Sequence, residues 1–197
     1  MNICFFASYN GSSARAITDA CFEGELRAAP TLLITNNADA AALEWAEAKG
    51  LKSFIVNKQT YDDPKAREEA MIEQLQKHKI TFGVLSGYMR PVPPAVIHFL
   101  DRRLVNIHPA LLPDFGGKGM YGAHVHRAVK ESGAAQTGIT IHQVSPVYDD
   151  GRILAQKTLK LNGKESAEDI EEMVKAVEPD FYIETLKKIQ KGQIILE

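Results

Sequence analysis

The sequence lacks a strong excess of charge of either sign, and this absence argues against partners that bind through a large net charge. Its 197 residues include 23 lysines and arginines and 25 aspartates and glutamates, which gives a formal net charge of -2. A protein that binds nucleic acid or an anionic membrane through its overall field needs a clear basic excess. We therefore expect neither nucleic acid nor membrane as a partner.

Cysteines are also scarce, and hydrophobic runs are short. Cys4 and Cys21 are the only cysteines, and they form no CxxC pair of the kind that binds zinc. We expect both to be core thiols in a reducing compartment. The start, MNICFFASYNGSS, lacks the basic residues and the length of a signal peptide, and its apolar run is too short to cross a bilayer. The expected location is the cytoplasm.

The sequence does contain a regular alternation of short apolar runs and helical patterns. Buried strands are predicted at NICFFAS, TLLITN, SFIVN, FGVLSG and LVNI, and helical periodicity lies between them at 12–22, 39–49, 64–79 and 93–100. This alternation predicts an α/β fold, Rossmann-like and doubly wound, with a mostly parallel sheet and helices on both faces. No repeat or linker interrupts it, so we expect a single domain over residues 1–197.

The pattern changes after residue 123. HVHRAVKESG predicts a short helix, and GITIHQV and ILAQKTLKL predict longer, alternating strands joined by the loop SPVYDDG. We expect an antiparallel element in this half of the chain. From Ser166, SAEDIEEMVKAV predicts an amphipathic helix with Ser166 as its N-cap.

A polar loop separates the first predicted strand from the first predicted helix. Asn10, Gly11, Ser12 and Ser13 would place backbone N–H groups and hydroxyls at a helix start, where the helix dipole favours a phosphate. The loop matches neither GxGxxG nor GxxxxGK[ST], which favours one phosphomonoester over a nucleoside triphosphate. An ordinary helix cap explains the same residues about equally well.

Two polar residues, Asn106 and His108, follow the apolar residues 104–105. Side chains alternate along an extended segment, so these two point to the same side and can converge on one small electrophile. An amide and a protonated histidine suit an oxyanion, and a nearby carboxylate would raise the pKa of the histidine. YDDG offers Asp149 or Asp150 as that carboxylate. From spacing alone, a turn held by side-chain hydrogen bonds is the more frequent explanation.

Several segments together resemble the folate-dependent formyltransferases. VNIHPALLPDFGG is similar to the Asn-Ile-His-Pro run of that family, GITIHQV to its Gly-Thr-x-x-His strand, and YDDGRILAQ to its loop aspartate and Ile-Leu-x-Gln strand. The NGSS loop stands where the family has Asn-Gly-Ser-Asn, so the resemblance covers nearly the whole chain. It implies the formyltransferase fold, 10-formyltetrahydrofolate as co-substrate and no metal.

The resemblance also implies roles for individual residues. The catalytic trio of the family corresponds to Asn106, His108 and Asp149. Counting back from GRILAQ favours Asp149 over its neighbour Asp150. The folate-binding residues correspond to Met89, Arg90, Pro91, Val92, Asn106, Ser145, Pro146, Val147, Tyr148 and Asp149. The residues that bind glycinamide ribonucleotide correspond to Gly11, Ser12, Ser13, Lys175 and Glu178.

Lys175 and Glu178 lie three residues apart on the last predicted helix and are therefore neighbours on its surface. The lysine suits a phosphate, and the glutamate suits a ribose hydroxyl. A solvated ion pair worth only about 0.3 kcal/mol is the alternative.

The implied reaction transfers the formyl group of 10-formyltetrahydrofolate to the primary amine of glycinamide ribonucleotide, in purine biosynthesis. Asn106 and protonated His108 would hold the oxyanion, and Asp149 would keep the histidine oriented and charged.

Formyltetrahydrofolate hydrolases, methionyl-tRNA formyltransferases and sugar-nucleotide formyltransferases would share the trio. The first two usually carry an extra domain, for which this chain leaves no room. A non-catalytic phosphometabolite-binding module is the alternative outside enzymes, and a monomer and a homodimer are equally open.

One segment departs from the family pattern. GGKGMYG, residues 116–122, is longer than the family loop, and its glycines predict either a mobile lid with Lys118 near the substrate or an exposed connector. His124 and His126 form an HxH pair without a third ligand, which favours helix capping and packing over a metal. The family's arginine near the third helix has no clear counterpart around residues 64–67.

Overall fold

The computed structural model of the chain describes all residues, 1–197, and they form two compact units. The first unit comprises Met1–Val105 together with Glu197, and the second comprises Asn106–Leu196. That residues 1–197 behave as a single domain stays a prediction.

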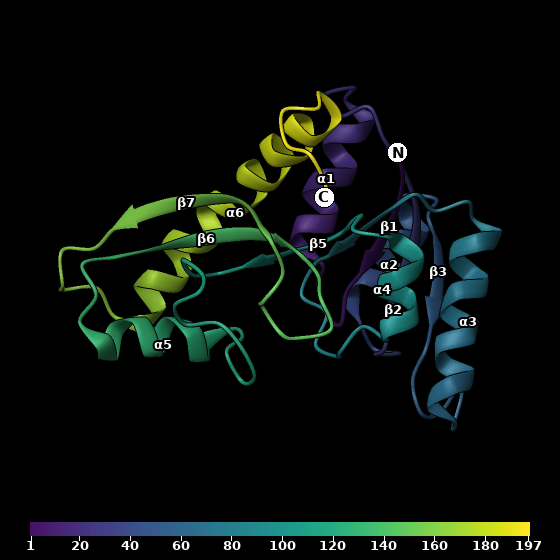
Figure 1. Cartoon of the computed structure of the whole chain (residues 1–197), viewed down its shortest axis with the longest axis horizontal. Helices are drawn as coiled ribbons and strands as arrows, with labels where there is room; N and C mark the ends of the chain where they lie inside the picture. The colour runs from purple at the N-terminus through teal and green to yellow at the C-terminus, as the bar shows by residue number, and fades with distance from the viewer. The chain divides into compact units, whose positions relative to one another are not determined.

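The first unit is a parallel sheet whose strands alternate with helices (Figure 1). Its elements in chain order are β1 Asn2–Phe6, α1 Ser12–Phe22, β2 Ala29–Thr35, α2 Ala41–Ala48, β3 Lys52–Ile55, α3 Pro64–Lys77, β4 Phe82–Leu85, α4 Pro94–Leu100 and the start of β5 Leu104–His108. The strand order is β3-β2-β1-β4-β5, and every pair is parallel. The predicted α/β, mostly parallel fold is therefore confirmed.

The direction of strand addition reverses between β1 and β4. The chain first builds outward from β1 to β3 and then returns to place β4 on the other side of β1. Because crossovers between parallel strands are right-handed, this reversal places α1 and α2 on one face and α3 and α4 on the other, and α3 does contact α4. Ligands of doubly wound sheets bind at such a switch point, outside the carboxyl ends of the strands.

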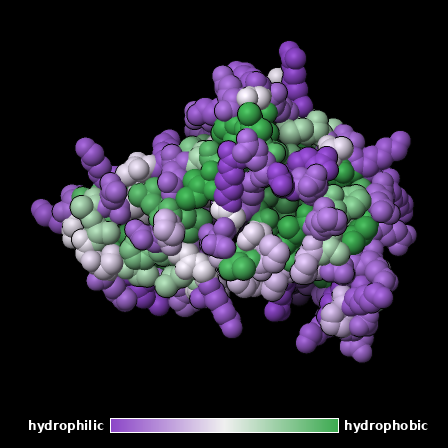
Figure 2. Space-filling view, viewed as in Figure 1, coloured by the Kyte–Doolittle hydropathy of each residue, from purple (hydrophilic) through white to green (hydrophobic).

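The central strands are apolar over most of their length because both faces of the sheet are covered. Ile3, Cys4, Phe5 and Phe6 of β1 are fully buried, as are Leu32, Leu33 and Ile34 of β2. The second cysteine, Cys21, is partly buried, and both thiols are free, as expected. Hydrophilic residues protrude from the face drawn in Figure 2, and most hydrophobic residues lie deeper between them.

The second unit begins within β5, at Asn106, and contains an antiparallel pair of strands. Its further elements are α5 Ala123–Ser132, β6 Gln136–Gln143, β7 Ile153–Lys160 and α6 Ala167–Gln190. β6 and β7 pair from Gln136 opposite Lys160 to His142 opposite Ile153, which confirms the predicted antiparallel element. α6 packs against β6, β7 and α5 (Figure 1).

α6 is the element that differs most from its predicted extent. The predicted N-cap, Ser166, is confirmed, and it forms a capping box with Asp169 in which each side chain is bonded to the backbone of the other residue. The helix then continues through Pro179 to Gln190, well beyond the predicted stretch. Proline removes one N–H donor, but Phe181, Tyr182 and Leu186 are buried, and their burial keeps the chain helical. None of the helices has the length and apolar character needed to cross a membrane.

Candidate active site

The end of β5 places two polar side chains on the same side of one strand. Asn106 and His108 alternate with Ile107, as extended geometry requires. The Nδ2 atom of Asn106 lies 3.1 Å from Nε2 of His142, and Nε2 of His108 lies 2.8 Å from the carbonyl oxygen of Phe115. The histidine is only 3% exposed.

Asp149 is the carboxylate that meets this pair. It lies in the loop between β6 and β7, and its Oδ2 atom is 3.5 Å from Nδ1 of His108. Its Oδ1 atom is 3.5 Å from Nε2 of His142, and the backbone N–H of Gly117 donates to Oδ2 at 2.9 Å. The neighbouring Asp150 is exposed and makes no such contact. The structure thus brings the three predicted catalytic residues together within the second unit.

The backbone of Asp149 adopts a conformation that few residues accept. Its φ is +54°, in the left-handed region, where aspartate is tolerated better than most side chains. Gly151 follows it, and a Cβ there would overlap the carbonyl oxygen of Gln143. The sequence DDG therefore fits a turn that aims a carboxylate inward and needs glycine two residues later.

His142 belongs to this cluster, although sequence analysis assigned it no role beyond its place in the GITIHQV motif. Its Nδ1 atom lies 2.9 Å from the carbonyl oxygen of Gln143, so Nδ1 carries the proton and donates. Nε2 is then an acceptor, and the amide nitrogen of Asn106 donates to it. This bond turns the Asn106 amide nitrogen inward and leaves its second N–H for another acceptor. His142 orients the Asn106 amide because of its position in the sheet, and the motif alone did not predict that position.

The segment that follows β5 is held by side chains of β6 and β7. Thr140 is fully buried, and its hydroxyl donates to the carbonyl of Ala110 at 2.7 Å and accepts the N–H of Leu112 at 3.0 Å. The amide of Gln156 donates to the carbonyl of Leu112 and to the Thr140 hydroxyl, both at 2.9 Å. These bonds explain the glutamine of the ILAQ motif, which fixes the exit path of the chain from β5.

The glycine-rich segment contacts the catalytic residues only at its start. The carbonyl of Phe115 accepts from His108, and the N–H of Gly117 donates to Asp149. A Cβ at Gly116 would lie 2.5 Å from Cδ2 of Leu112 and 3.3 Å from Cβ of Asp149, so any other residue would require Leu112 to move. Lys118 is exposed.

Burial dominates the ionisation of His108. Burial lowers its pKa from the ordinary 6.5, and the charge of Asp149 and the bond to the Phe115 carbonyl raise it by less. Asp149 raises the pKa of His108 as expected, but the expected protonated form of the ring is not favoured, because burial has the larger effect. Its single proton lies on Nε2, facing Phe115.

Asp149 is held in its charged form. Burial acts to raise its pKa, but the nearby rings of His142 and His108 and the bond from the Gly117 N–H together lower it below the ordinary 3.8. The site therefore combines a fixed negative charge with a neutral imidazole, which gains a favourable partner when it accepts a proton.

The two other histidines nearby have separate surroundings. His124 is exposed and packs edge-on against Tyr121, with ring centres 5.4 Å apart. His126 is buried in α5, and its Nδ1 atom has no hydrogen-bond partner. No group of three or more His, Cys, Asp or Glu side chains is arranged so that it could hold a metal ion.

The predicted phosphate loop lies at the switch point of the first unit. Gly11 is the residue before α1, with a φ of +64°, and no side chain caps the helix. The backbone N–H groups of Gly11 and Ser12 donate to no acceptor of the chain. The explanation as an ordinary side-chain cap therefore fails. Ser12 is exposed, whereas Ser13 is buried.

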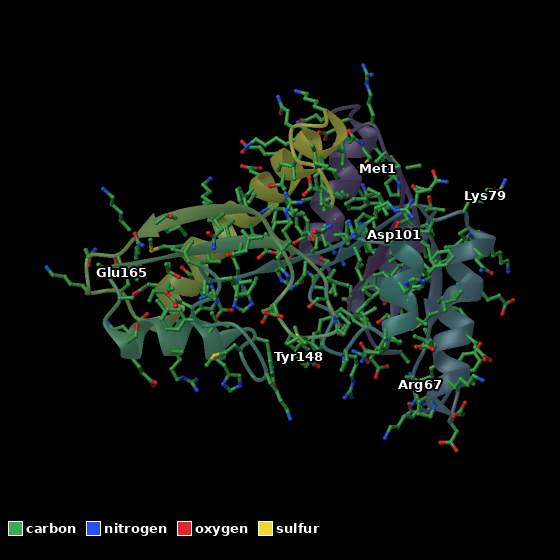
Figure 3. The ribbon with its side chains drawn as sticks, viewed as in Figure 1. Met1, Arg67, Lys79, Asp101, Tyr148 and Glu165 are labelled. Atoms are coloured by element: carbon green, nitrogen blue, oxygen red, sulfur yellow. The ribbon has the colours of Figure 1, made fainter.

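The predicted folate segments are loops that expose apolar side chains. In the first unit, Met89 is 41% exposed and its N–H donates to the Ser8 hydroxyl at 2.7 Å. It is followed by exposed Arg90 and Pro91 and buried Val92. In the second unit, Ser145 closes a turn with Val147, and exposed Val147 and Tyr148 follow Pro146 (Figure 3).

Lys175 and Glu178 both lie on α6, but the ion pair that Lys175 forms is with another residue. Its Nζ atom lies 2.5 Å from Oε1 of Glu171, one turn earlier. The lysine side chain is 67% exposed, so it can exchange this partner for a ligand at little cost.

Known proteins resemble this chain over most of its length. The sequence profile of the family described as formyl transferase matches residues 1–186. Phosphoribosylglycinamide formyltransferase of Bacillus subtilis is 34% identical over 93% of this chain and 92% of its own length. The chloroplastic phosphoribosylglycinamide formyltransferase of Arabidopsis thaliana is 36% identical over 98% of this chain, which spans 66% of that relative. The crystal structure of glycinamide ribonucleotide transformylase 1 from Symbiobacterium toebii matches with a TM-score of 0.90 at 29% identity, over 100% of this chain and 91% of that one.

Proposed function

Because the chain belongs to the formyl transferase family, we propose that it transfers the formyl group of 10-formyltetrahydrofolate to the primary amine of glycinamide ribonucleotide. The observation that carries this proposal is the cluster of Asn106, His108 and Asp149 in one unit, with His142 orienting the amide. The names of the relatives support the acceptor.

The first step is attack of the amine on the formyl carbon. The formyl oxygen becomes an oxyanion, and the free N–H of Asn106 donates to it. Because His142 already holds the other N–H, the amide needs no reorientation during the reaction. The barrier falls because this donor is in place before the charge develops.

His108 moves the proton. Its neutral ring accepts a proton from the attacking amine on Nδ1, directly or through a water, and becomes an imidazolium beside Asp149. The imidazolium stabilises the oxyanion and then gives the proton to the folate nitrogen as the bond from that nitrogen to the formyl carbon breaks. The amine loses one proton and the folate gains one, so the steps balance without a covalent enzyme intermediate.

The substrates occupy the segments that the sequence predicts. In the first unit, Gly11, Ser12 and Ser13 bind the phosphate of glycinamide ribonucleotide, which the unpaired N–H groups of Gly11 and Ser12 support. In the second unit, the exposed ammonium group of Lys175 suits a phosphate, and Glu178 suits the ribose. The folate binds at residues 89–92 and 145–149, where exposed apolar side chains suit its rings.

An assay of formyl transfer tests the proposal. Purified chain is mixed with a 10-formyl folate analogue and glycinamide ribonucleotide, and loss of the formyl folate is followed by absorbance. We expect turnover that requires the amine and nearly disappears in His108→Ala, whose circular dichroism should match the wild type. Formyl release without the amine would identify a hydrolase, transfer only to an amino sugar nucleotide a different transferase, and no turnover a binding module.

We also propose that the chain acts in the cytoplasm as a monomer or a homodimer. Its small net charge supports the expected lack of nucleic acid and membrane partners. Size-exclusion chromatography with light scattering distinguishes the two assemblies.

A further inference from the structure

Arg15, on the first turn of α1, binds two carbonyl groups of neighbouring segments. Its Nε atom donates to the carbonyl of Asn10 at 2.8 Å, and Nη2 donates to the carbonyl of Ala41 at 3.0 Å. The guanidinium carbon lies 5.4 Å from the centre of the Trp45 ring, which is nearly buried. The guanidinium group of Arg15 thus stacks on a buried aromatic ring, and this contact restricts the positions of the two carbonyls to which it donates.

The bond to Asn10 fixes the orientation of the peptide that joins Asn10 to Gly11. A trans peptide is planar, so its carbonyl and its N–H point in opposite directions. Since the carbonyl of Asn10 points to Arg15, the N–H of Gly11 points away from it. This N–H and that of Ser12 are the donors that find no acceptor in the chain.

No other side chain bonds to the Asn10–Gly11 peptide, although Gly11 is buried and its carbonyl accepts the N–H of Arg15 at 3.0 Å. The N–H of Ala42 donates to the carbonyl of Tyr9 at 3.0 Å, which ties the residue before Asn10 to the start of α2. Asn10 is exposed, and Gly11, with its positive φ, is the kind of residue that moves most easily. Arg15 is therefore the side chain that holds the Asn10–Gly11 peptide.

We infer that Arg15 is a positioning residue for the substrate phosphate: it holds the Asn10–Gly11 peptide so that the N–H groups of Gly11 and Ser12 face the anion. The inference rests on the proposed binding of a phosphorylated acceptor. The proposed role needs no contact between Arg15 and the phosphate, since it acts through the two carbonyls that Arg15 binds. Its effect is on the shape of the loop.

The test compares two ligands that differ only in the phosphate. Isothermal titration calorimetry measures the affinity of wild type and Arg15→Gln for glycinamide ribonucleotide and for the phosphate-free glycinamide riboside. We expect the affinity for the ribonucleotide to fall about tenfold, as for loss of one charge-assisted hydrogen bond, and that for the riboside to stay unchanged. Arg15→Lys keeps the positive charge but lacks the planar guanidinium group that binds two carbonyls at once, so its affinity for the ribonucleotide should fall about threefold.

Arg67 provides a matched control in the same unit. Its Nη1 atom donates to the carbonyls of Tyr61 and Asp62, at 2.6 and 2.8 Å, at the start of α3 (Figure 3). Arg67→Gln therefore removes a similar clamp from a different loop and should change neither affinity.

The outcomes separate this inference from the proposed function. Equal losses for both ligands, or no loss for either, would overturn the positioning role, as would absent binding of the ribonucleotide to the wild type. If the wild type transfers no formyl group but the phosphate-dependent loss appears, the proposed reaction fails and the role of Arg15 stands. Arg15→Lys gives the same comparison if Arg15→Gln does not fold, as judged by circular dichroism.

Discussion

His108 faces a hydrogen-bond acceptor on each side of its ring, yet burial favours its neutral form. The Phe115 carbonyl meets Nε2 and the Asp149 carboxylate lies near Nδ1. A proton gained on Nδ1 during the reaction would therefore come to lie beside a negative charge already in place. In this arrangement Asp149 stabilises the state that follows proton transfer more than the state that precedes it.

Replacement of Asp149 should affect turnover far more than replacement of its neighbour. Asp149→Asn removes the charge that stabilises the imidazolium, and we expect kcat to fall about 100-fold, within the range for disrupted acid–base catalysis. Asp150→Asn is the matched control, because that side chain is exposed and should leave kcat unchanged. Equal losses in steady-state assays of the two variants would contradict the assignment.

The position of the proton on His108 can be measured directly. Because Nε2 donates to the Phe115 carbonyl, nitrogen-15 NMR near pH 7 should show a neutral ring protonated at Nε2. The pKa of His108 should lie below 6.5, as burial requires, and Asp149→Asn should lower it further by removing a negative charge that raises it. A ring protonated at Nδ1, or a higher pKa in the variant, would contradict this description.

β6 is the element that connects the catalytic residues to the rest of the second unit. One end carries His142, and two residues earlier the buried Thr140 holds the segment that leaves β5. Gly138 lies where a Cβ would overlap the carbonyl oxygen of Lys157, so β7 can pair closely. The strand thus positions both the amide of Asn106 and the chain that follows His108.

Two buried threonines of β6 should respond in opposite ways to the same substitution. Thr140→Val leaves the N–H of Leu112 and the carbonyl of Ala110 with fewer partners, and should lower the free energy of unfolding by about 2 kcal/mol. Thr137 is also buried, but its hydroxyl has no partner, so Thr137→Val should be neutral or stabilising. Urea unfolding of both variants measures this difference, and similar losses in both would refute it.

For the molecule as a whole, the fold follows from patterns that are local in the sequence. The strands of the first unit are short apolar runs, and the NIHP and YDDG segments correspond to a known family. The contacts of His142, Phe115 and Thr140 are different, because they depend on the pairing of β6 with β7 and on loop conformations. Helix α6 is longer than predicted for a similar reason, because the stabilisation from burying Phe181 and Tyr182 outweighs the cost of Pro179 within the helix.

The stability of the whole chain should decrease as the pH falls below about 6.5. Burial lowers the pKa values of His108 and His126 from the ordinary 6.5, so near that pH the unfolded chain binds protons that the folded chain does not. The contribution is fully present above the unfolded pKa and is lost as the pH falls. Asp149, with its lowered pKa, acts in the same direction below about pH 4.

Chemical denaturation at pH 7.5 and pH 5.5 measures this dependence. His126→Gln removes one of the two buried rings and should reduce the difference between the two free energies of unfolding. An increase in stability at pH 5.5, or an unchanged difference in the variant, would show that these histidines are not held neutral by burial.

The loop of residues 115–117 contacts the catalytic side chains through main-chain groups alone. A carbonyl and an N–H are present in nearly every amino acid, so the contacts to His108 and Asp149 specify a backbone path and leave most side chains unspecified. The path itself limits the choice of residue, because Phe115 has a φ of +55°, in the left-handed region that glycine and asparagine adopt most easily. In a deep mutational scan, position 115 should therefore favour glycine and asparagine and reject β-branched residues, and position 116 should disfavour large side chains, because a Cβ there would press on Leu112 and Asp149.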